Sequence, residues 1–127
     1  MASKARLWAG RGASGLVALF LLVDGTMKLI GPSPVVEGSA RLGYAAHLLV
    51  PLGIIELSCV ILYLIPQTSA LGALLLTGFL GGAVATHFRV EDPLLGFTFF
   101  PLYVATLAWA GLLLRDRRLR VLVPFTH

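Results

Sequence analysis

Long runs of apolar residues alternate with short polar breaks along the whole chain. Each run comes close to the ~20 residues that a transmembrane helix needs. The runs cover residues 12–30, 48–65, 70–87 and 98–114. Pro32 and Pro34 follow the first run and Pro66 follows the second, and proline cannot continue a helix interior. The pattern predicts an all-α integral membrane protein, folded as a four-helix transmembrane bundle.

Composition supports the membrane prediction and limits the size of the fold. The chain has 127 residues, of which 57% are hydrophobic and 13% are charged, and its mean hydropathy is +0.90. These values lie well outside those of an ordinary soluble domain, and the length leaves room for one transmembrane domain over residues 1–127. A basic start before an apolar run is also typical of a signal peptide, but Asp24 and Lys28 would interrupt its apolar region.

Three local features predict finer structure. The third run carries the spacing Gly78-x-x-x-Gly82, which lets a second backbone approach closely in lipid, so we expect this run to be the central packing helix. The connection between the first two runs contains residues 41–44 (RLGY), for which we expect a short interfacial helix. The single cysteine, Cys59, lies in an apolar run and is expected to pack in the core without an internal disulfide.

Positive charge gathers at the two ends of the chain. The net charge is +4, but the basic residues do not follow a solvated face interleaved with aromatics, so we expect no nucleic acid partner. Four spans place both termini on one side of the membrane, and most basic residues belong to that side. They are Lys4, Arg6, Arg11, Arg115, Arg117, Arg118 and Arg120. The other side has only Arg41 and Arg89, so the positive-inside rule predicts a multi-pass protein of the cytoplasmic (inner) membrane, with both termini and the basic tail 115–127 in the cytoplasm.

Four ionisable residues interrupt the apolar runs, namely Asp24, Lys28, Glu56 and His87. A charged side chain at the bilayer centre costs about 2.5–3.5 kcal/mol on insertion scales, so these residues are expected to face the bundle interior. At ~1.5 Å per helical residue, Asp24 lies about 9 Å and Glu56 about 12 Å below the non-cytoplasmic surface, and His87 ends the third run on that side. We therefore predict that the four residues converge in one polar site, and all four are candidate catalytic residues.

Each of these residues also has a purely structural interpretation. Asp24 and Lys28 are four residues apart on one helix face and can form a salt bridge that only keeps the helix insertable. Glu56 can make a hydrogen bond between helices, and His87 can be an interfacial residue.

Four further residues are candidate ligand-binding residues on the same side: Tyr103, Arg89, Tyr44 and His47. Tyr103 lies near the predicted depth of Glu56, where its hydroxyl could donate to a ligand or to the carboxylate, or be satisfied within the bundle. Tyr44 and His47 could close the site from the loop, and Arg89 could reach a ligand or the lipid headgroups. No metal site is predicted, because no run carries a His-x-x-x-His or Glu-x-x-His pair.

Three segments of the chain resemble the DoxX-like family. They are residues 25–29 (GTMKL), residues 52–57 (LGIIEL) and residues 82–89 (GAVATHFR). The resemblance covers nearly the whole chain and implies a small four-helix bundle in the cytoplasmic membrane, with Lys28, Glu56 and His87 as polar positions. Relatives are associated with quinone-linked oxidoreductase systems and membrane redox complexes, and distant animal relatives look like assembly chaperones. Asp24 departs from the small residue that is usual before the Gly-x-x-Lys motif, which points to a specialised site.

The polar site predicts binding of a small lipophilic molecule with a polar end, such as a quinone-like or isoprenoid-like compound. Acid and base groups in one dry pocket could act on it by proton transfer. The alternative is a non-catalytic membrane subunit or assembly chaperone of a redox or other membrane complex, whose glycine-rich third run supports a partner or a homo-oligomer. A transporter is a third possibility, and four spans would then require dimerisation. The sequence leaves the cofactor and the enzymatic character open.

Overall fold

Helices make up the computed structural model, which describes residues 2–116 and 119. Its α-helices are α1 (Ala2–Ile30), α2 (Ser33–Arg41), α3 (Leu49–Leu64), α4 (Ser69–Arg89) and α5 (Phe100–Arg115). Short turns of 3-10 helix precede α3 and α4, at Ala46–Leu48 and Pro66–Thr68, and a π-helical turn, Leu94–Thr98, precedes α5. The described residues contain no strand. Four segments are long and apolar enough to cross a membrane, which confirms the all-helical membrane architecture.

The observed helices follow the predicted runs closely at seven of their eight ends. The largest differences lie at the end of α4, which is Arg89 rather than residue 87, and at the start of α5, which is Phe100 rather than residue 98. The exception is α1, which begins at Ala2 rather than at residue 12. Among the added residues, Gly10 is buried against α5, since a Cβ atom there would lie 2.7 Å from the carbonyl oxygen of Gly111. Tertiary contact therefore extends the first helix beyond its apolar run.

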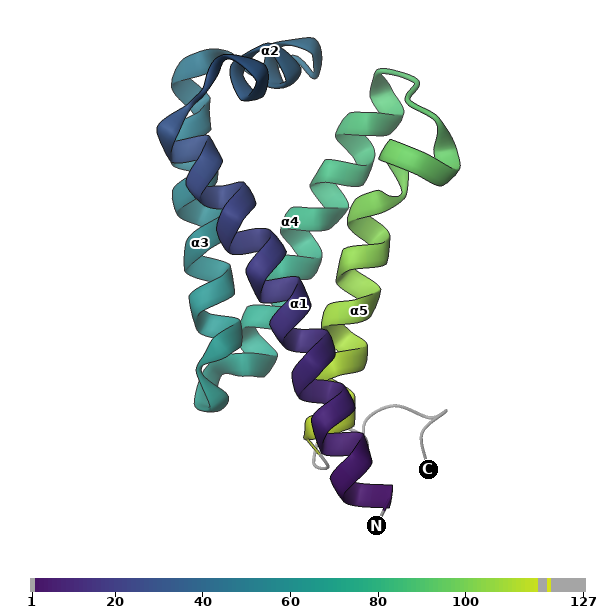
Figure 1. The fold of residues 1–127 in the computed structure, drawn as a ribbon. Coiled ribbons are helices and arrows are strands. Elements are labelled where there is room, and N and C mark those ends of the chain that lie inside the picture. The colour runs from purple at the N-terminus through teal and green to yellow at the C-terminus, as the bar shows by residue number, and fades with distance from the viewer. Residues whose placement is uncertain (1, 117–118, 120–127) are drawn as a thin grey trace.

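The connection after α1 differs from the prediction. The helix expected at residues 41–44 is wrong in position, because α2 covers Ser33–Arg41 and the chain then turns at Gly43, with a φ angle of 96°. Pro34 lies in the first turn of α2, where a helical residue needs no amide donor, so proline starts a helix here. α2 has no buried residue, and it lies across one end of the bundle (Figure 1).

The four long helices form a ring in which α1 and α4 lie diagonally opposite. α1 packs against α3 and α5, and α4 packs against the same two helices. α1 crosses the bundle obliquely, from α5 at the end where the N-terminus lies to α3 at the end where α2 lies (Figure 1). We call these the N-terminal end and the α2 end. α1 starts and α5 finishes at the same end of the bundle, so the chain crosses the bundle an even number of times.

The expectation that Gly78 and Gly82 make the third span the central packing helix is wrong. Both glycines are exposed, and a Cβ atom added at either would meet nothing within 4 Å. The close approaches lie elsewhere: on α1, Gly10 meets α5 and Gly25 meets α3, and on α4, a Cβ atom at Gly72 would lie 2.2 Å from the backbone nitrogen of Tyr63 on α3. The spacing Gly78-x-x-x-Gly82 therefore lies on the outer surface of α4.

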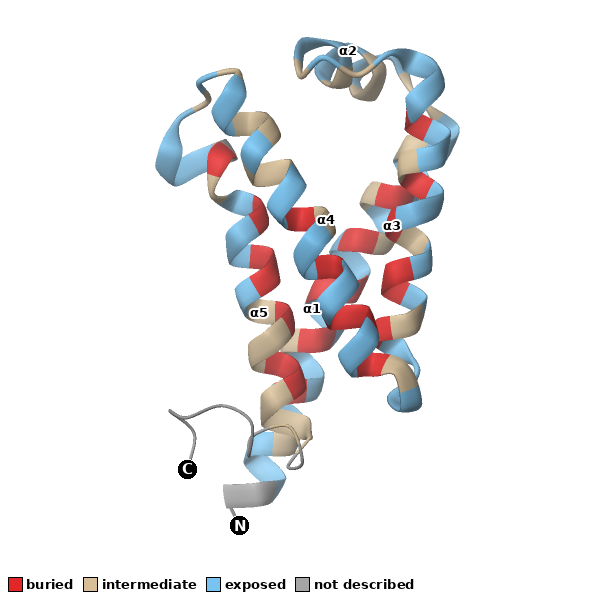
Figure 2. Cartoon of the chain, turned by 180° about the vertical axis from the view of Figure 1, so that it is seen from behind, coloured by how far each residue is buried: buried red, intermediate tan, exposed pale blue. Residues whose placement is uncertain are grey.

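Buried side chains concentrate toward the N-terminal end and the middle of the bundle (Figure 2). The largest fully buried apolar side chains are Tyr63, Leu21, Leu76, Leu112 and Val60. Cys59 is buried as predicted. In α4 the buried residues extend from Ser69 to Leu80, and none occurs from residue 81 onward. Beyond residue 80, α4 is consequently held at the α2 end by polar contacts rather than by fully buried apolar side chains.

Candidate functional site

A three-residue ionic cluster joins α1 to α3 and is named here the Lys28 cluster: Asp24, Lys28 and Glu56. Lys28 Nζ donates to Glu56 Oε1 at 2.7 Å and also pairs with Asp24 one turn earlier on α1. The Glu56 side chain is 0% exposed, that of Lys28 is 19% exposed and that of Asp24 is 42% exposed. One ammonium group therefore bridges a fully buried carboxyl and a half-buried one.

Two glycines bring α1 and α3 close enough for this cluster to form. A Cβ atom at Gly53 would lie 2.9 Å from the carbonyl oxygen of Gly25 and 3.2 Å from Lys28 Cβ. Side chains lean toward the N-terminus of their own helix. Lys28 on α1 therefore leans along the helix axis toward the middle of the bundle. Glu56, on the antiparallel α3, leans toward the α2 end, so the two side chains meet beside the glycine contact.

The remaining contacts of the Lys28 cluster leave one polar atom unsatisfied. Oε2 of Glu56 is buried and has no hydrogen-bond partner among the described residues. On the side of α4, Lys28 Nζ lies 5.9 Å from the centroid of the Phe79 ring. Two carboxyls share one ammonium, so the cluster carries one net negative charge when both carboxyls are ionised. A net charge at membrane depth is costly, so a proton or a hydrogen bond from a bound molecule would stabilise the cluster.

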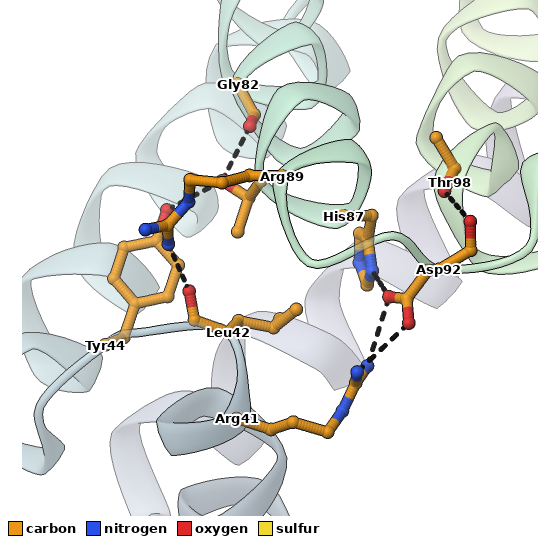
Figure 3. A network of polar contacts seen from close by, with 9 residues as sticks. Arg41, Leu42, Tyr44, Gly82, His87, Arg89, Asp92 and Thr98 are labelled. Carbon is orange, nitrogen blue, oxygen red and sulfur yellow. Dashed lines mark hydrogen bonds and ion pairs between the residues drawn. The ribbon is translucent and has the colours of Figure 1, made fainter.

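A second polar network lies at the α2 end and centres on Asp92, between α4 and α5 (Figure 3). Arg41, the last residue of α2, contacts the two carboxylate oxygens of Asp92 at 3.0 Å each. His87 Nδ1 lies 2.6 Å from Asp92 Oδ2 and donates to it, because an ionised carboxylate can only accept. Thr98 donates its hydroxyl to the backbone oxygen of Asp92 at 2.9 Å.

Electrostatics favours the ionised form of Asp92. The hydrogen bond from Arg41, and then that from His87, lower the pKa of the Asp92 carboxyl below its ordinary value. The same hydrogen bond raises the pKa of Arg41. The two residues therefore remain oppositely charged over the physiological pH range, and the contact ties the end of α2 to the chain segment that follows α4.

Two further contacts tie the chain after α2 to α4. Arg89 donates to the backbone oxygen of Leu42 at 2.5 Å, and the hydroxyls of Tyr44 and Thr86 lie 3.2 Å apart (Figure 3). Thr86 in turn donates to the carbonyl oxygen of Gly82 at 2.8 Å. We give the name α2 latch to three contacts: Arg89 with Leu42, Tyr44 with Thr86, and Arg41 with Asp92.

The structure distributes the predicted candidate residues over two groups rather than one. Asp24, Lys28 and Glu56 lie together as expected, whereas His87 belongs to the Asp92 network. Along α4, His87 follows Phe79, the neighbour of Lys28, by eight residues, or about 12 Å at 1.5 Å per residue. The prediction of a single convergent site is therefore wrong for His87, although all four residues lie toward the α2 end.

The candidate ligand-binding residues also separate. Tyr44 and Arg89 belong to the α2 latch. Tyr103 is 47% exposed and donates to the backbone oxygen of Leu95 at 3.0 Å, so its hydroxyl does not reach Glu56. His47 is exposed in the turn before α3, outside both polar networks of the described chain.

Sequence reasoning missed the central residue of the second network. Asp92 follows two predicted basic positions, His87 and Arg89, and is the acidic residue directly before Pro93 in the connection between spans. Its partner Arg41 was expected in a short interfacial helix and as one of two basic residues on the non-cytoplasmic side. An acidic residue and a basic residue in two loops on the same side of the membrane are the signal that could have suggested their pairing.

Comparison with known proteins decides the family. A model of the DoxX-like family matches residues 12–111, which is well over half of the chain. The protein belongs to the DoxX-like family. No curated protein and no solved structure matches the chain. The matched range includes the residues of the Lys28 cluster and of the Asp92 network. Together with the four apolar helices, membership indicates a multi-pass membrane protein.

Proposed function

We propose that this DoxX-like protein binds a small lipophilic molecule whose polar end meets the Lys28 cluster. The observation that carries the proposal is the fully buried Glu56 carboxyl, with one oxygen bonded to Lys28 and the other without a partner in the described residues. A buried polar atom without a partner is costly, and a hydroxyl or carbonyl at the head of a lipophilic molecule can interact with this cluster. Quinone-like and isoprenoid-like compounds have that chemistry and dissolve in the bilayer.

The cluster is also suited to acid–base chemistry. Lys28 can donate to an oxygen of the bound molecule, while Glu56 or Asp24 accepts a proton. Such an enzyme would catalyse proton transfer, for example an isomerisation or a ring opening. His87 and Arg89 lie about two turns beyond Phe79 along α4. They would therefore contact a molecule as it enters the site, rather than its reacting atoms.

Binding of short-chain probes tests this proposal. A short-chain quinone, its quinol and an isoprenoid alcohol are titrated against the protein in lipid nanodiscs. Glu56→Gln and Lys28→Met are expected to weaken binding of the preferred probe by about tenfold or more, the value of one charge-assisted hydrogen bond. Ser58→Ala is the matched control, because Ser58 lies on the same helix but is exposed and bonds only the carbonyl oxygen of Ile54. Equal affinity in all four proteins would contradict the proposal.

The second candidate function is a non-catalytic membrane subunit or assembly chaperone, including one that works as a homo-oligomer or with a membrane-complex partner. The close approach of Gly25 and Gly53 favours it, because the ion pair beside that contact would fasten α1 to α3 without any ligand. In that case Glu56→Gln and Lys28→Met would lower the yield of folded protein or its assembly with a partner. The probes above would then bind to none of the proteins.

We also propose that the protein resides in the cytoplasmic (inner) membrane with both termini in the cytoplasm. The basic residues of α1 and the end of α5 lie at one end of the bundle, and Arg41 and Arg89 at the other, as the positive-inside rule requires. A reporter that is active only in the cytoplasm, fused to either terminus, is expected to be active. A reporter active only outside the cytoplasm would be active instead if the orientation were reversed.

A further inference from the structure

Helix α2 is bounded at both ends by glycines with unusual backbone conformations. Gly31 precedes it with a φ angle of 69°, and Gly43 follows it with a φ angle of 96°. Both angles belong to the left-handed region that glycine adopts readily and other residues avoid. Between these two points the helix has no buried residue. Since packing contributes little to its position, contacts near its C-terminal end must hold it.

Those contacts are the α2 latch. The strongest is the Arg41–Asp92 pair, in which both carboxylate oxygens are engaged and the Asp92 side chain is only 8% exposed. α2 starts directly after α1 and spans nine residues, or about 13 Å, before it reaches its partner beyond α4. The helix thus extends from α1 over the α2 end, and the side chain of its last residue, Arg41, reaches the connection between α4 and α5 (Figures 1 and 3).

One face of α4 leads from the latch to the Lys28 cluster. Leu76, Leu80, Ala83 and His87 follow one another at spacings of three or four residues and therefore share a face. Leu80 is buried, whereas Ala83 and His87 are only partly buried. Ala83 is four residues, or about 6 Å, from both His87 and Phe79. It consequently lies halfway between the Asp92 network and the ring beside Lys28.

We propose that α2 is a hinged lid at the α2 end, and that the α2 latch, mainly through its Arg41–Asp92 pair, controls access from the aqueous phase to the Lys28 cluster. Rotation about Gly31 and Gly43 moves the lid once the latch contacts break. The role of the lid in ligand access rests on the proposed function, but its motion does not and can be measured without any ligand.

Thiol labelling measures the opening of the lid directly. The probe is Ala83→Cys in a Cys59→Ser background, reconstituted in vesicles and treated with a membrane-impermeant methanethiosulfonate reagent. Arg41→Gln is expected to raise the labelling rate about fivefold, the usual upper effect of losing one solvent-accessible ion pair. Arg41→Lys keeps the charge and is expected to stay within about twofold of the parent.

Glu37→Gln is the matched control for the charge change. Glu37 is an exposed acidic residue of the same helix and makes no ion pair within the described chain, so the labelling rate should not change. A second measurement covers the case in which Ala83→Cys disturbs packing. Spin labels at Glu37→Cys and Leu95→Cys, both at exposed positions, report the distance from the lid to the start of the fourth span. Arg41→Gln should broaden this distance distribution.

The outcomes separate the lid from the binding proposal. Equal labelling rates in the Arg41→Gln and Glu37→Gln proteins, or no labelling in any of them, would overturn the lid, as would an unchanged distance distribution. A mobile lid in a protein that binds none of the probes would leave the lid intact and remove only the proposed function.

Discussion

At the N-terminal end, Tyr63 joins three helices through directed hydrogen bonds, whereas at the α2 end the Arg41–Asp92 ion pair holds a helix that has no fully buried residue. Arg115 donates to Ser14 at 3.0 Å, Ser14 lies 2.7 Å from the Tyr63 hydroxyl, and that hydroxyl donates to the carbonyl oxygen of Ala108 at 2.6 Å. Each hydroxyl has one proton, so Ser14 must donate to Tyr63. The whole chain of hydrogen bonds therefore has one direction and is fully satisfied. The Lys28 cluster, by contrast, retains an unpartnered carboxylate oxygen.

This contrast assigns stability to the region around Tyr63 and the proposed function to the region around the Lys28 cluster. A satisfied polar network in a tightly packed region fixes one arrangement of the helices. An incompletely satisfied one costs stability and persists where a ligand or a proton completes it. The following predictions test whether the two ends differ in this way.

The largest effect is expected at the N-terminal end. Tyr63→Ala removes a fully buried side chain and its hydrogen bonds, and should lower the free energy of unfolding by about 3–5 kcal/mol. Unfolding in mixed detergent micelles, followed by circular dichroism, measures the loss. Tyr103→Ala is the control, because Tyr103 is half exposed and contacts only a nearby backbone oxygen through its hydroxyl. A loss at Tyr103 as large as that at Tyr63 would refute the proposed asymmetry.

Removal of the ammonium group should have the next largest effect. Lys28→Met leaves Glu56 buried without its partner and should lower the free energy of unfolding by about 3 kcal/mol. Adding Glu56→Met removes the buried carboxyl as well and should recover most of that stability. The same unfolding assay provides the comparison, and no recovery in the double variant would show that the cluster itself stabilises the fold.

Alanine substitution of a packed glycine and of an exposed glycine should change the free energy of unfolding in opposite directions. Gly53→Ala places a methyl group 2.9 Å from the backbone oxygen of Gly25 and should cost about 1–3 kcal/mol through overpacking. Gly78→Ala meets open space and should stabilise α4 by about 0.5–1 kcal/mol, the usual helix preference for alanine. Equal destabilisation by the two substitutions would instead indicate that the Gly78 face is packed against another molecule in the membrane.

The smallest effect concerns pH at the latch. The pKa of Asp92 is lowered, so its contribution to latching is present above the ordinary value of 3.8 and is lost as the pH falls through the lower value. Its partner Arg41, whose pKa is raised, keeps its positive charge as the pH falls. Labelling of Ala83→Cys relative to Glu37→Cys should therefore remain constant from about pH 8 to pH 5. A rise within that interval would show that another group controls the lid.

The sequence predicts the spans well because a membrane helix needs a run of apolar residues of fixed length, and these runs are visible without any tertiary information. It predicts the position of α2 poorly, because proline both ends one helix and begins another. Pro32 and Pro34, which follow α1, are equally consistent with a loop that contains no helix. The early start of α1 depends on packing between Gly10 and Gly111, which no local pattern reveals.

The candidate site was predictable only in part, for a related reason. The number of residues from each span end predicts similar depths for Asp24 and Glu56, and Lys28 lies one turn from Asp24 on the same helix face. The first two spans are neighbours in the structure, so the three side chains meet. His87 lies about 12 Å further along α4 than Phe79, the neighbour of Lys28, and there it contacts Asp92. The contact of Ser14 with Arg115 spans 101 residues of sequence and depends on how the first and last spans meet.

The most direct test of the central claim, that the Lys28 cluster is a ligand site, replaces the whole cluster by apolar residues. The variant Asp24→Leu/Lys28→Met/Glu56→Met removes every charge without leaving one unpaired, and a buried ion network replaced in this way commonly leaves stability unchanged or raised. The measurement is the molar amount of lipophilic molecule, other than bulk phospholipid, that mass spectrometry finds in the extract of the purified protein. We predict a near-stoichiometric compound in the native protein and its loss from the folded triple variant. An equal amount in both proteins, or none in either, would contradict the claim.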